Sequence, residues 1–123
     1  MRVEYYELSD GTEPAKDFIN SLDVGMKNKM FREIELLEAF GTELRMPHSK
    51  HLDDGIFELR AKFSSNISRV LYFFFYQGKA ILTNGFVKKT DKTPQEEIKI
   101  AKNIVQIMKK EMGGKIDNFK KSS

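Results

Sequence analysis

Apolar and polar residues alternate most clearly over residues 56–63. The two sets are Phe57, Leu59, Ala61 and Phe63 on one side and Glu58, Arg60 and Lys62 on the other. Because successive side chains of a strand point to opposite faces, this alternation predicts a strand with one apolar and one charged face. Aromatic and β-branched runs over residues 67–76 and 79–87 predict two more strands, joined by a two-residue hairpin loop at Gln77-Gly78. A weaker alternation over residues 2–8 predicts a first strand.

Two segments between the first strand and the alternating one have helical spacing. Thr12 as N-cap, with Pro14 in the first turn, predicts a short helix that ends near Leu22. Asp23 is expected to cap a longer helix that ends at Gly41. The apolar stripe of this second helix consists of Met30, Ile34, Leu37 and Phe40.

A third helix is predicted after the last strand. The run Thr93-Pro94-Gln95-Glu96 has the form of a capping box with proline in the first turn. The apolar stripe that follows consists of Ile98, Ala101, Val105, Met108 and Met112, and Gly113-Gly114 is expected to end the helix. Residues 44–55 are rich in turn-forming residues and are predicted to form a loop.

The predicted order is strand, two helices, three antiparallel strands, helix. This order favours an α+β fold, with an antiparallel sheet of about four strands, the two N-terminal helices packed on it and a C-terminal helix. Residues 1–112 are expected to form a single domain and residues 113–123 a flexible C-terminal tail.

The composition adds bounds to this picture. The chain has 123 residues, of which 40% are hydrophobic and 32% charged, as in a folded domain rather than a disordered one. No apolar run approaches the roughly 20 residues of a membrane helix, and the N-terminus lacks a signal-peptide pattern. The absence of cysteine excludes disulfides and thiolate metal sites. We therefore expect a cytoplasmic protein that does not contact membranes.

Charge is distributed unevenly along the chain, although the net charge is only +3. Acidic residues concentrate at residues 33–43 and 96–97. The strand region is instead dominated by cations, namely Arg60, Lys62, Arg69, Lys79, Lys88, Lys89 and Lys92. This segregation predicts one basic face, which suits a polyanionic partner.

Counting residues through the predicted hairpins places these cations relative to one another. If Tyr76 pairs with Lys79, then Arg69 lies opposite Phe86, and Lys88 shares their face. A four-residue loop at residues 63–66 sets Arg60 opposite Arg69, whereas a three-residue loop sets it one position away and turns it to the other face. We favour the first register, because it forms a tight cationic pocket.

Each of these residues also has a structural interpretation. Arg60 could form an ion pair with Glu58 or Glu97, Lys88-Lys89 could be a soluble strand edge, and Phe86 could belong to the core. RNA-binding pockets nevertheless combine the groups that these residues would bring together, namely arginine guanidinium groups, lysines and an aromatic ring.

A metal site and a cofactor site have little support in the sequence. His48 and His51 are three residues apart and close to Asp53 and Asp54, but no regular helix or further ligand accompanies them. No glycine-rich phosphate loop or dinucleotide motif is present. We therefore expect neither a metal nor a cofactor.

Three motifs, at residues 54–60 (DGIFELR), 68–72 (SRVLY) and 85–90 (GFVKKT) followed by Thr93-Pro94, together resemble the HigB-like branch of the RelE superfamily. These are small toxins of bacterial, phage and plasmid toxin–antitoxin systems. The resemblance runs in order from the first strand to about Glu111. It implies a compact sheet with two helices on one side, metal-independent cleavage of mRNA, often on the ribosome, and neutralisation by an antitoxin, commonly a helix-turn-helix protein.

The resemblance also implies roles for individual residues. The motif arginines fall on Arg60 and Arg69 and the basic strand end on Lys88 and Lys89, so these four are the expected catalytic residues. From the chemistry of RNA binding rather than from the resemblance, the expected RNA contacts are Lys62, Tyr72, Phe86 and Thr90, with Phe86 or Tyr72 stacking on a base. Arginine suits the stabilisation of phosphate charge, and Lys88 or Lys89 is a candidate base.

Two points stay open in the sequence. Some relatives carry a histidine or tyrosine near the C-terminus as an acid or base, and residues 116–123 contain no counterpart. An alternative function is a non-catalytic module that docks on ribosomal RNA or on an antitoxin.

Overall fold

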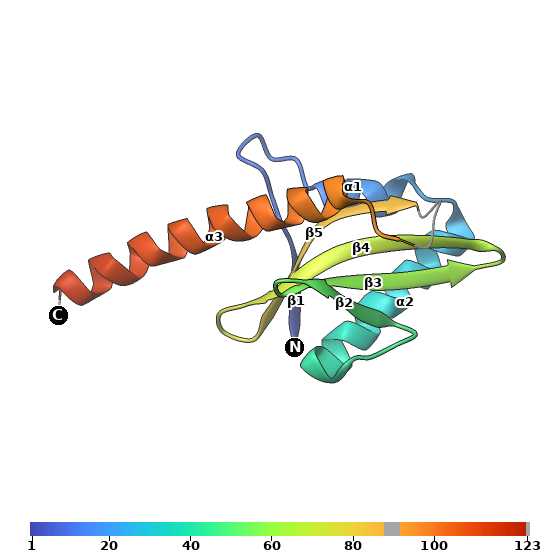
Figure 1. Cartoon of the computed structure of the whole chain (residues 1–123), viewed down its shortest axis with the longest axis horizontal. Coiled ribbons are helices and arrows are strands. Elements are labelled where there is room, and N and C mark those ends of the chain that lie inside the picture. Colours follow the sequence, from blue (N-terminus) through green and yellow to red (C-terminus); the bar gives the residue numbers. More distant parts are fainter. Residues whose placement is uncertain (88–91, 123) are drawn as a thin grey trace.

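A mixed β-sheet with helices on both faces forms the framework of the protein (Figure 1). The computed structural model describes residues 1–87 and 92–122, and side chains as far as Met112. The elements are β1 (Arg2–Tyr5), α1 (Pro14–Ser21), α2 (Val24–Phe40), the 3₁₀ turn η1 (Gly41–Glu43), β2 (Ser49–Asp53), β3 (Ile56–Phe63), β4 (Asn66–Phe75), β5 (Lys79–Val87) and α3 (Gln95–Ser122). The fold is therefore α+β, as the sequence predicts.

Within the described residues the sheet has five strands, in the order β1-β5-β4-β3-β2. The prediction of about four antiparallel strands is wrong in two respects: β1 runs parallel to β5, and β2 lies in the segment predicted as a loop. β2 is an edge strand that pairs with β3 through its backbone, and exposed side chains such as Lys50 and His51 give it little hydrophobic signal.

Each face of the sheet packs against its own helices. On one face α1 and α2 contribute Ile19, Met30 and Leu37 to a core with Leu59, Tyr72 and Leu82. On the other face α3 contributes Ala101 and Ile104 to a core with Leu71, Phe73 and Ile81. Because β4 is buried on both sides, its sequence reads as a continuous apolar run rather than as an alternation.

The predicted ends of α2 are confirmed, whereas the N-cap of α1 is Glu13 rather than the predicted Thr12. The Asp23 carboxylate accepts a hydrogen bond from the Met26 N–H at 3.2 Å, and Gly41 ends α2 with a φ of 53°. Phe40, expected on the apolar stripe of α2, is instead 56% exposed, because the buried stripe ends at Leu37.

The last helix differs from its prediction. α3 continues through Gly113 and Gly114 to Ser122, where the sequence predicted an end at the glycine pair. Glycine weakens a helix by about 1 kcal/mol per residue but does not break it. That residues 113–123 form a flexible tail stays a prediction.

Arg69 pairs with Phe86 as expected, because two departures from the predicted β4–β5 hairpin cancel each other. The hairpin loop has three residues rather than two, because Phe75 pairs with Lys79. An extra residue, Thr83, then shifts the register back between Leu71 and Tyr72. The pairing is thus as predicted, although the loop length from which it was counted is wrong.

Among the described residues, no helix combines the length and apolar character needed to cross a bilayer.

Candidate nucleic-acid interface

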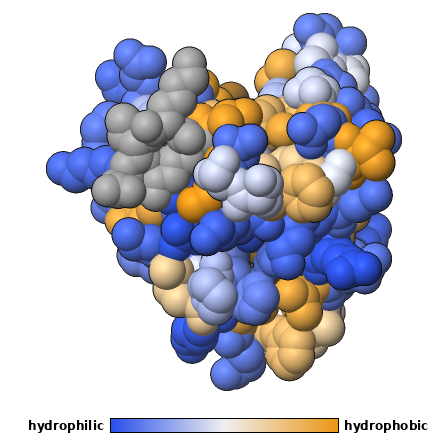
Figure 2. Space-filling view, turned by 90° about the vertical axis from the view of Figure 1, so that its right-hand side faces the viewer, coloured by the Kyte–Doolittle hydropathy of each residue, from blue (hydrophilic) through white to orange (hydrophobic). Residues whose placement is uncertain are grey.

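Arg60 and Arg69 lie directly opposite each other on neighbouring strands, which confirms the register that the sequence favoured. They lie near the end of the sheet where β3 turns into β4. Figure 2 views the molecule from this end, and hydrophilic residues cover most of the surface that it shows. The surroundings of the two arginines nevertheless differ sharply.

Arg69 is 2% exposed and belongs to a buried ion pair. Its Nη1 donates to Glu58 Oε1 at 2.5 Å, and the Thr93 hydroxyl donates to the same carboxylate oxygen at 2.8 Å. The sequence raised Glu58 as a partner of Arg60, but Arg69 is the arginine that fills this position. In this arrangement no phosphate reaches the Arg69 guanidinium, so its expected phosphate contact has no support in the structure.

This buried group, the Glu58–Arg69–Thr93 cluster, is incompletely hydrogen-bonded. Within the described residues, Arg69 Nε and Nη2 and Glu58 Oε2 have no hydrogen-bond partner. A buried ion pair stabilises a fold only weakly, whereas removal of one partner leaves an uncompensated charge. Arg69 is therefore better understood as part of the scaffold than as an RNA contact.

Arg60 is half-buried and lines a cleft of about 300 Å³ at the edge of β3. The residues around the cleft are Lys29, Glu33, Met46, Pro47, His48, Arg60, Lys62 and Ile67, and we call it the His48 cleft. As far as the described residues show, the one hydrogen bond of the Arg60 guanidinium is a weak one to Met46 Sδ at 3.2 Å. Most of its donors remain available to an anion.

Lys62 is the second cation that β3 brings to the His48 cleft. It is exposed and forms no ion pair within the described parts of the chain. Lys29 reaches the cleft from α2, so three cationic side chains face one carboxylate, that of Glu33. This excess of positive charge favours an anionic ligand.

Glu33 and His48 form a hydrogen-bonded pair inside the cleft that the sequence analysis did not identify. Glu33 is buried on α2 and its Oε2 lies 2.8 Å from His48 Nδ1, while its Oε1 lies 3.6 Å from Lys29 Nζ. One sequence signal was available: Glu33 is charged, yet it lies on the same helix face as the core residues Met30 and Leu37.

The two aromatic residues expected to contact RNA lie on opposite faces of the sheet. Phe86 is partly buried beside Arg69 and packs against the core under α3. Tyr72 is 1% exposed in the core under α1 and α2, where it stacks on Phe57 and hydrogen-bonds to Ser49. Burial raises the pKa of Tyr72, which keeps the phenol neutral. A ring so buried cannot stack on a base, so that expected role is withdrawn.

Lys88, Lys89 and Thr90 lie outside the described residues, and their expected roles are left as predictions.

The two histidines do not act together. His48 faces Glu33, whereas the His51 ring packs edge-on against Phe57 and accepts a hydrogen bond from the Gly55 N–H at 3.3 Å. Across residues 1–87 and 92–112, no group of three or more potential metal ligands gathers.

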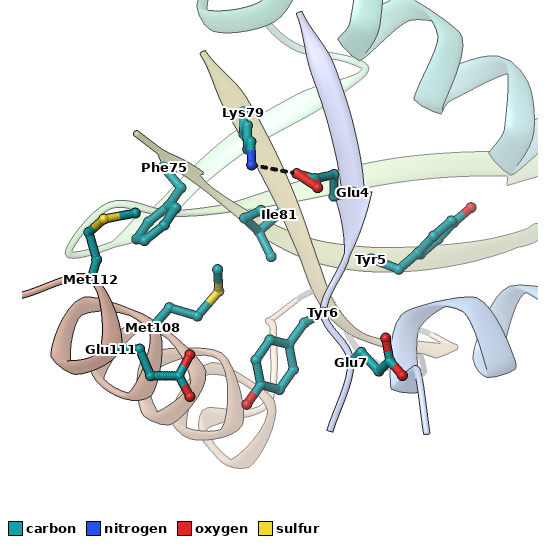
Figure 3. A pocket seen from close by; sticks show the side chains of 10 residues that line it. All are labelled: Glu4, Tyr5, Tyr6, Glu7, Phe75, Lys79, Ile81, Met108, Glu111 and Met112. Atoms are coloured by element: carbon teal, nitrogen blue, oxygen red, sulfur yellow. Dashed lines mark ion pairs between the residues drawn. The ribbon is translucent and has the colours of Figure 1, made fainter. Parts of the chain in front are cut away.

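A second cavity, of about 310 Å³, lies between β1, the end of the β4–β5 hairpin and α3 (Figure 3). Its lining is apolar and acidic: Tyr5, Tyr6, Phe75, Ile81, Met108 and Met112 with Glu4, Glu7 and Glu111. Lys79 is its single described cation and is paired with Glu4 at 3.2 Å. This cavity is therefore unsuited to a polyanion, in contrast to the His48 cleft.

A family model described as phage derived protein Gp49-like (DUF891) matches residues 17–106. The match begins within α1 and ends within α3, and it includes both arginines and the whole His48 cleft. No curated protein matches the chain.

Proposed function

Because the chain belongs to the phage-derived Gp49-like family, which is associated with toxin–antitoxin toxins of the RelE superfamily, we propose that it is a type II toxin of the HigB-like kind that cuts mRNA. The proposal includes a partner antitoxin, expected to be a helix-turn-helix protein. It also includes action on mRNA held by translating ribosomes, and therefore in the cytoplasm.

The observation that carries the proposal is the cationic His48 cleft. Within the described residues, Arg60 offers a guanidinium that is held only by a weak contact, and Lys62 offers an exposed ammonium group. A guanidinium can hold two phosphate oxygens at once, and its charge persists at every physiological pH. We therefore assign Arg60 to the scissile phosphate and Lys62 to a neighbouring phosphate.

The reaction follows from the chemistry of RNA. The 2′-oxygen of one nucleotide attacks the adjacent phosphorus, the bond to the 5′-oxygen breaks, and a 2′,3′-cyclic phosphate forms. Negative charge accumulates on the phosphate oxygens in the transition state, where Arg60 would stabilise it. Lys88 and Lys89 remain proposed catalytic residues, and Thr90 remains a proposed RNA contact. Phe86 remains a proposed stacking surface, and Arg69 supports the strand pair from within.

Mapping of mRNA ends in a reconstituted translation reaction tests this function. The wild-type chain should leave breaks with a 2′,3′-cyclic phosphate or a 3′-phosphate and a 5′-hydroxyl. Arg60→Ala should lower the rate by about 10²–10³, the usual effect of removing one transition-state donor. Lys79→Ala, which removes a cation from the other cavity, is the matched control and should cut normally. Intact mRNA, or ends with a 3′-hydroxyl and a 5′-phosphate, would refute the proposal.

One observation favours the alternative function, a binding module that does not cut. Burial of Arg69 with Glu58 removes one of the cations that the resemblance assigns to catalysis. Such a module would bind ribosomal RNA with a marked salt dependence and leave it intact. The same end-mapping experiment separates the two functions, because only the nuclease produces new ends.

A further inference from the structure

The Glu33–His48 pair has the geometry of an oriented proton-transfer group. A carboxylate only accepts hydrogen bonds, so the 2.8 Å contact places the imidazole proton on Nδ1. In a neutral imidazole the other nitrogen, Nε2, is then the acceptor. A buried partner that fixes the tautomer in this way is a common arrangement for catalytic histidines.

The surrounding structure holds both members in place. Glu33 is 2% exposed and fixed on α2 beside the core. His48 is anchored through its backbone, because its carbonyl accepts the Arg60 N–H at 2.9 Å and its own N–H donates to the Arg45 carbonyl at 3.0 Å. The backbone bond to Arg60 makes the histidine a direct neighbour of the arginine assigned to the scissile phosphate.

The ring is also accessible. The His48 side chain is 39% exposed and lines the cleft together with Lys29, Arg60 and Lys62. Among the described residues Nε2 has no hydrogen-bond partner, so it can receive a proton from a ligand. By contrast, His51 lies on the edge strand β2 against Phe57 and has no carboxylate within hydrogen-bond distance in the described structure.

Stability alone is a poor explanation for the pair. A carboxylate buried on the core-facing side of a helix is costly to desolvate, and an apolar residue of similar size would usually stabilise the fold as well or better. A buried carboxylate that points at a half-exposed histidine in a cationic cleft is the pattern expected of a functional site.

We propose that His48 is the general base of the cleavage reaction and that Glu33 is its positioning residue. The proposal rests on the proposed nuclease function and gives the role of proton acceptor to His48 in place of Lys88 or Lys89, the candidate bases that the sequence suggests. Nε2 takes the proton of the 2′-hydroxyl as the 2′-oxygen–phosphorus bond forms. The bond from phosphorus to the 5′-oxygen breaks, and this oxygen takes a proton from water. His48 then returns its proton to solvent.

A pH dependence of the rate is expected for a reaction that uses a general base. The charged groups around the His48 ring are Glu33 and Lys29 on α2 and Arg60 and Lys62 on β3. A general base acts only in its neutral form, so the single-turnover rate should rise with pH.

The test is the pH dependence of single-turnover cleavage of ribosome-bound mRNA by wild type, His48→Gln, Glu33→Gln and His51→Gln. His48→Gln should lower the rate by about 10²–10⁴ and abolish the rise with pH. Glu33→Gln should lower the maximal rate with little change in apparent KM, because the imidazole loses the carboxylate that orients it. His51→Gln, the matched control, should behave as wild type.

Urea unfolding of each variant distinguishes a folding defect from a catalytic one. Added imidazole should restore cleavage by His48→Ala, which would support the assignment of His48 as the base directly. Cleavage by folded His48→Gln with the wild-type rate and pH profile overturns the base assignment. If Arg60→Ala still cuts slowly in that case, the proposed nuclease function stands without His48 as its base. A wild-type chain that cuts no RNA overturns both proposals.

Discussion

Two polar groups on the same pair of strands, the Glu58–Arg69–Thr93 cluster and the His48 cleft, use similar residues in opposite ways. In the cluster the arginine is sealed and its carboxylate partner is 0% exposed. In the cleft, Arg60 lies directly opposite Arg69 and, as far as the described parts of the chain show, keeps most of its donors available. Thr93, just before α3, closes over the first arginine, whereas the cleft opens beside the sheet edge. Position in a register therefore does not decide whether an arginine holds the fold or binds a ligand.

The largest expected effect comes from breaking the sealed cluster. Arg69→Ala leaves the Glu58 carboxylate buried without its counter-ion, and the free energy of unfolding should fall by about 3–5 kcal/mol in urea titrations. The double variant Glu58→Leu/Arg69→Met removes both charges and should regain most of that loss. An Arg69→Ala chain as stable as wild type would show that the cluster is not structural.

Arg60 should show the reverse behaviour. Arg60→Ala should change the free energy of unfolding by no more than about 0.5 kcal/mol, as is usual for partly exposed side chains without strong partners. Arg60→Lys should keep the charge but lose the two-oxygen grip on phosphate, and so cut at a rate between wild type and Arg60→Ala. Equal rates for lysine and arginine would reduce the role of Arg60 to charge alone.

A smaller effect is expected from the contact that ties α3 to the β5 bulge. Asn84 Nδ2 donates to Glu97 Oε2 at 2.8 Å and to the Glu97 carbonyl at 3.2 Å. Asn84→Ala should cost about 1–2 kcal/mol. It should also raise amide hydrogen exchange at the start of α3 and around Arg69 while leaving α2 beside His48 protected. Equal loss of protection in both places would mean that the two regions open together.

The smallest effect is expected for an exposed ion pair between β2 and α3. Lys102 Nζ lies 2.6 Å from Asp53 Oδ2, and this contact lowers the pKa of Asp53 and raises that of Lys102. The contribution of this pair to the free energy of unfolding should be present at pH values above the pKa of aspartate in the unfolded chain. It should disappear as the pH falls through the folded Asp53 value, and again as the pH rises through the Lys102 value. The Tm difference between wild type and Asp53→Asn measures it, and a difference that persists in strong acid would exclude the pair as its source.

Much of the framework could be predicted from local patterns. The alternation over residues 56–63 matches β3 at both ends, and the cap at Asp23 and the stop at Gly41 bound α2. β2 was missed because an edge strand with exposed polar side chains lacks a hydrophobic period. The pairing of Arg69 with Phe86 was reached through a loop one residue too short, and the Thr83 bulge cancelled the difference.

The site was only partly predictable for a different reason. Arg60 and Lys62 could be found because they alternate along one strand. Glu33 and His48 are 15 residues apart on a helix and a loop, so only the folded chain brings them together. Burial of Arg69 likewise depends on Thr93, which arrives from 24 residues away. Strand periodicity gives the face of a side chain, but not what covers it.

The most direct test compares single-turnover mRNA cleavage by Arg60→Ala and by the double variant Glu58→Leu/Arg69→Met, both shown to be folded. We expect Arg60→Ala to be slow by about 10²–10³, whereas the double variant should retain most of the wild-type rate. An inactive double variant beside an active Arg60→Ala chain would place the phosphate contact at Arg69 and refute its assignment to Arg60.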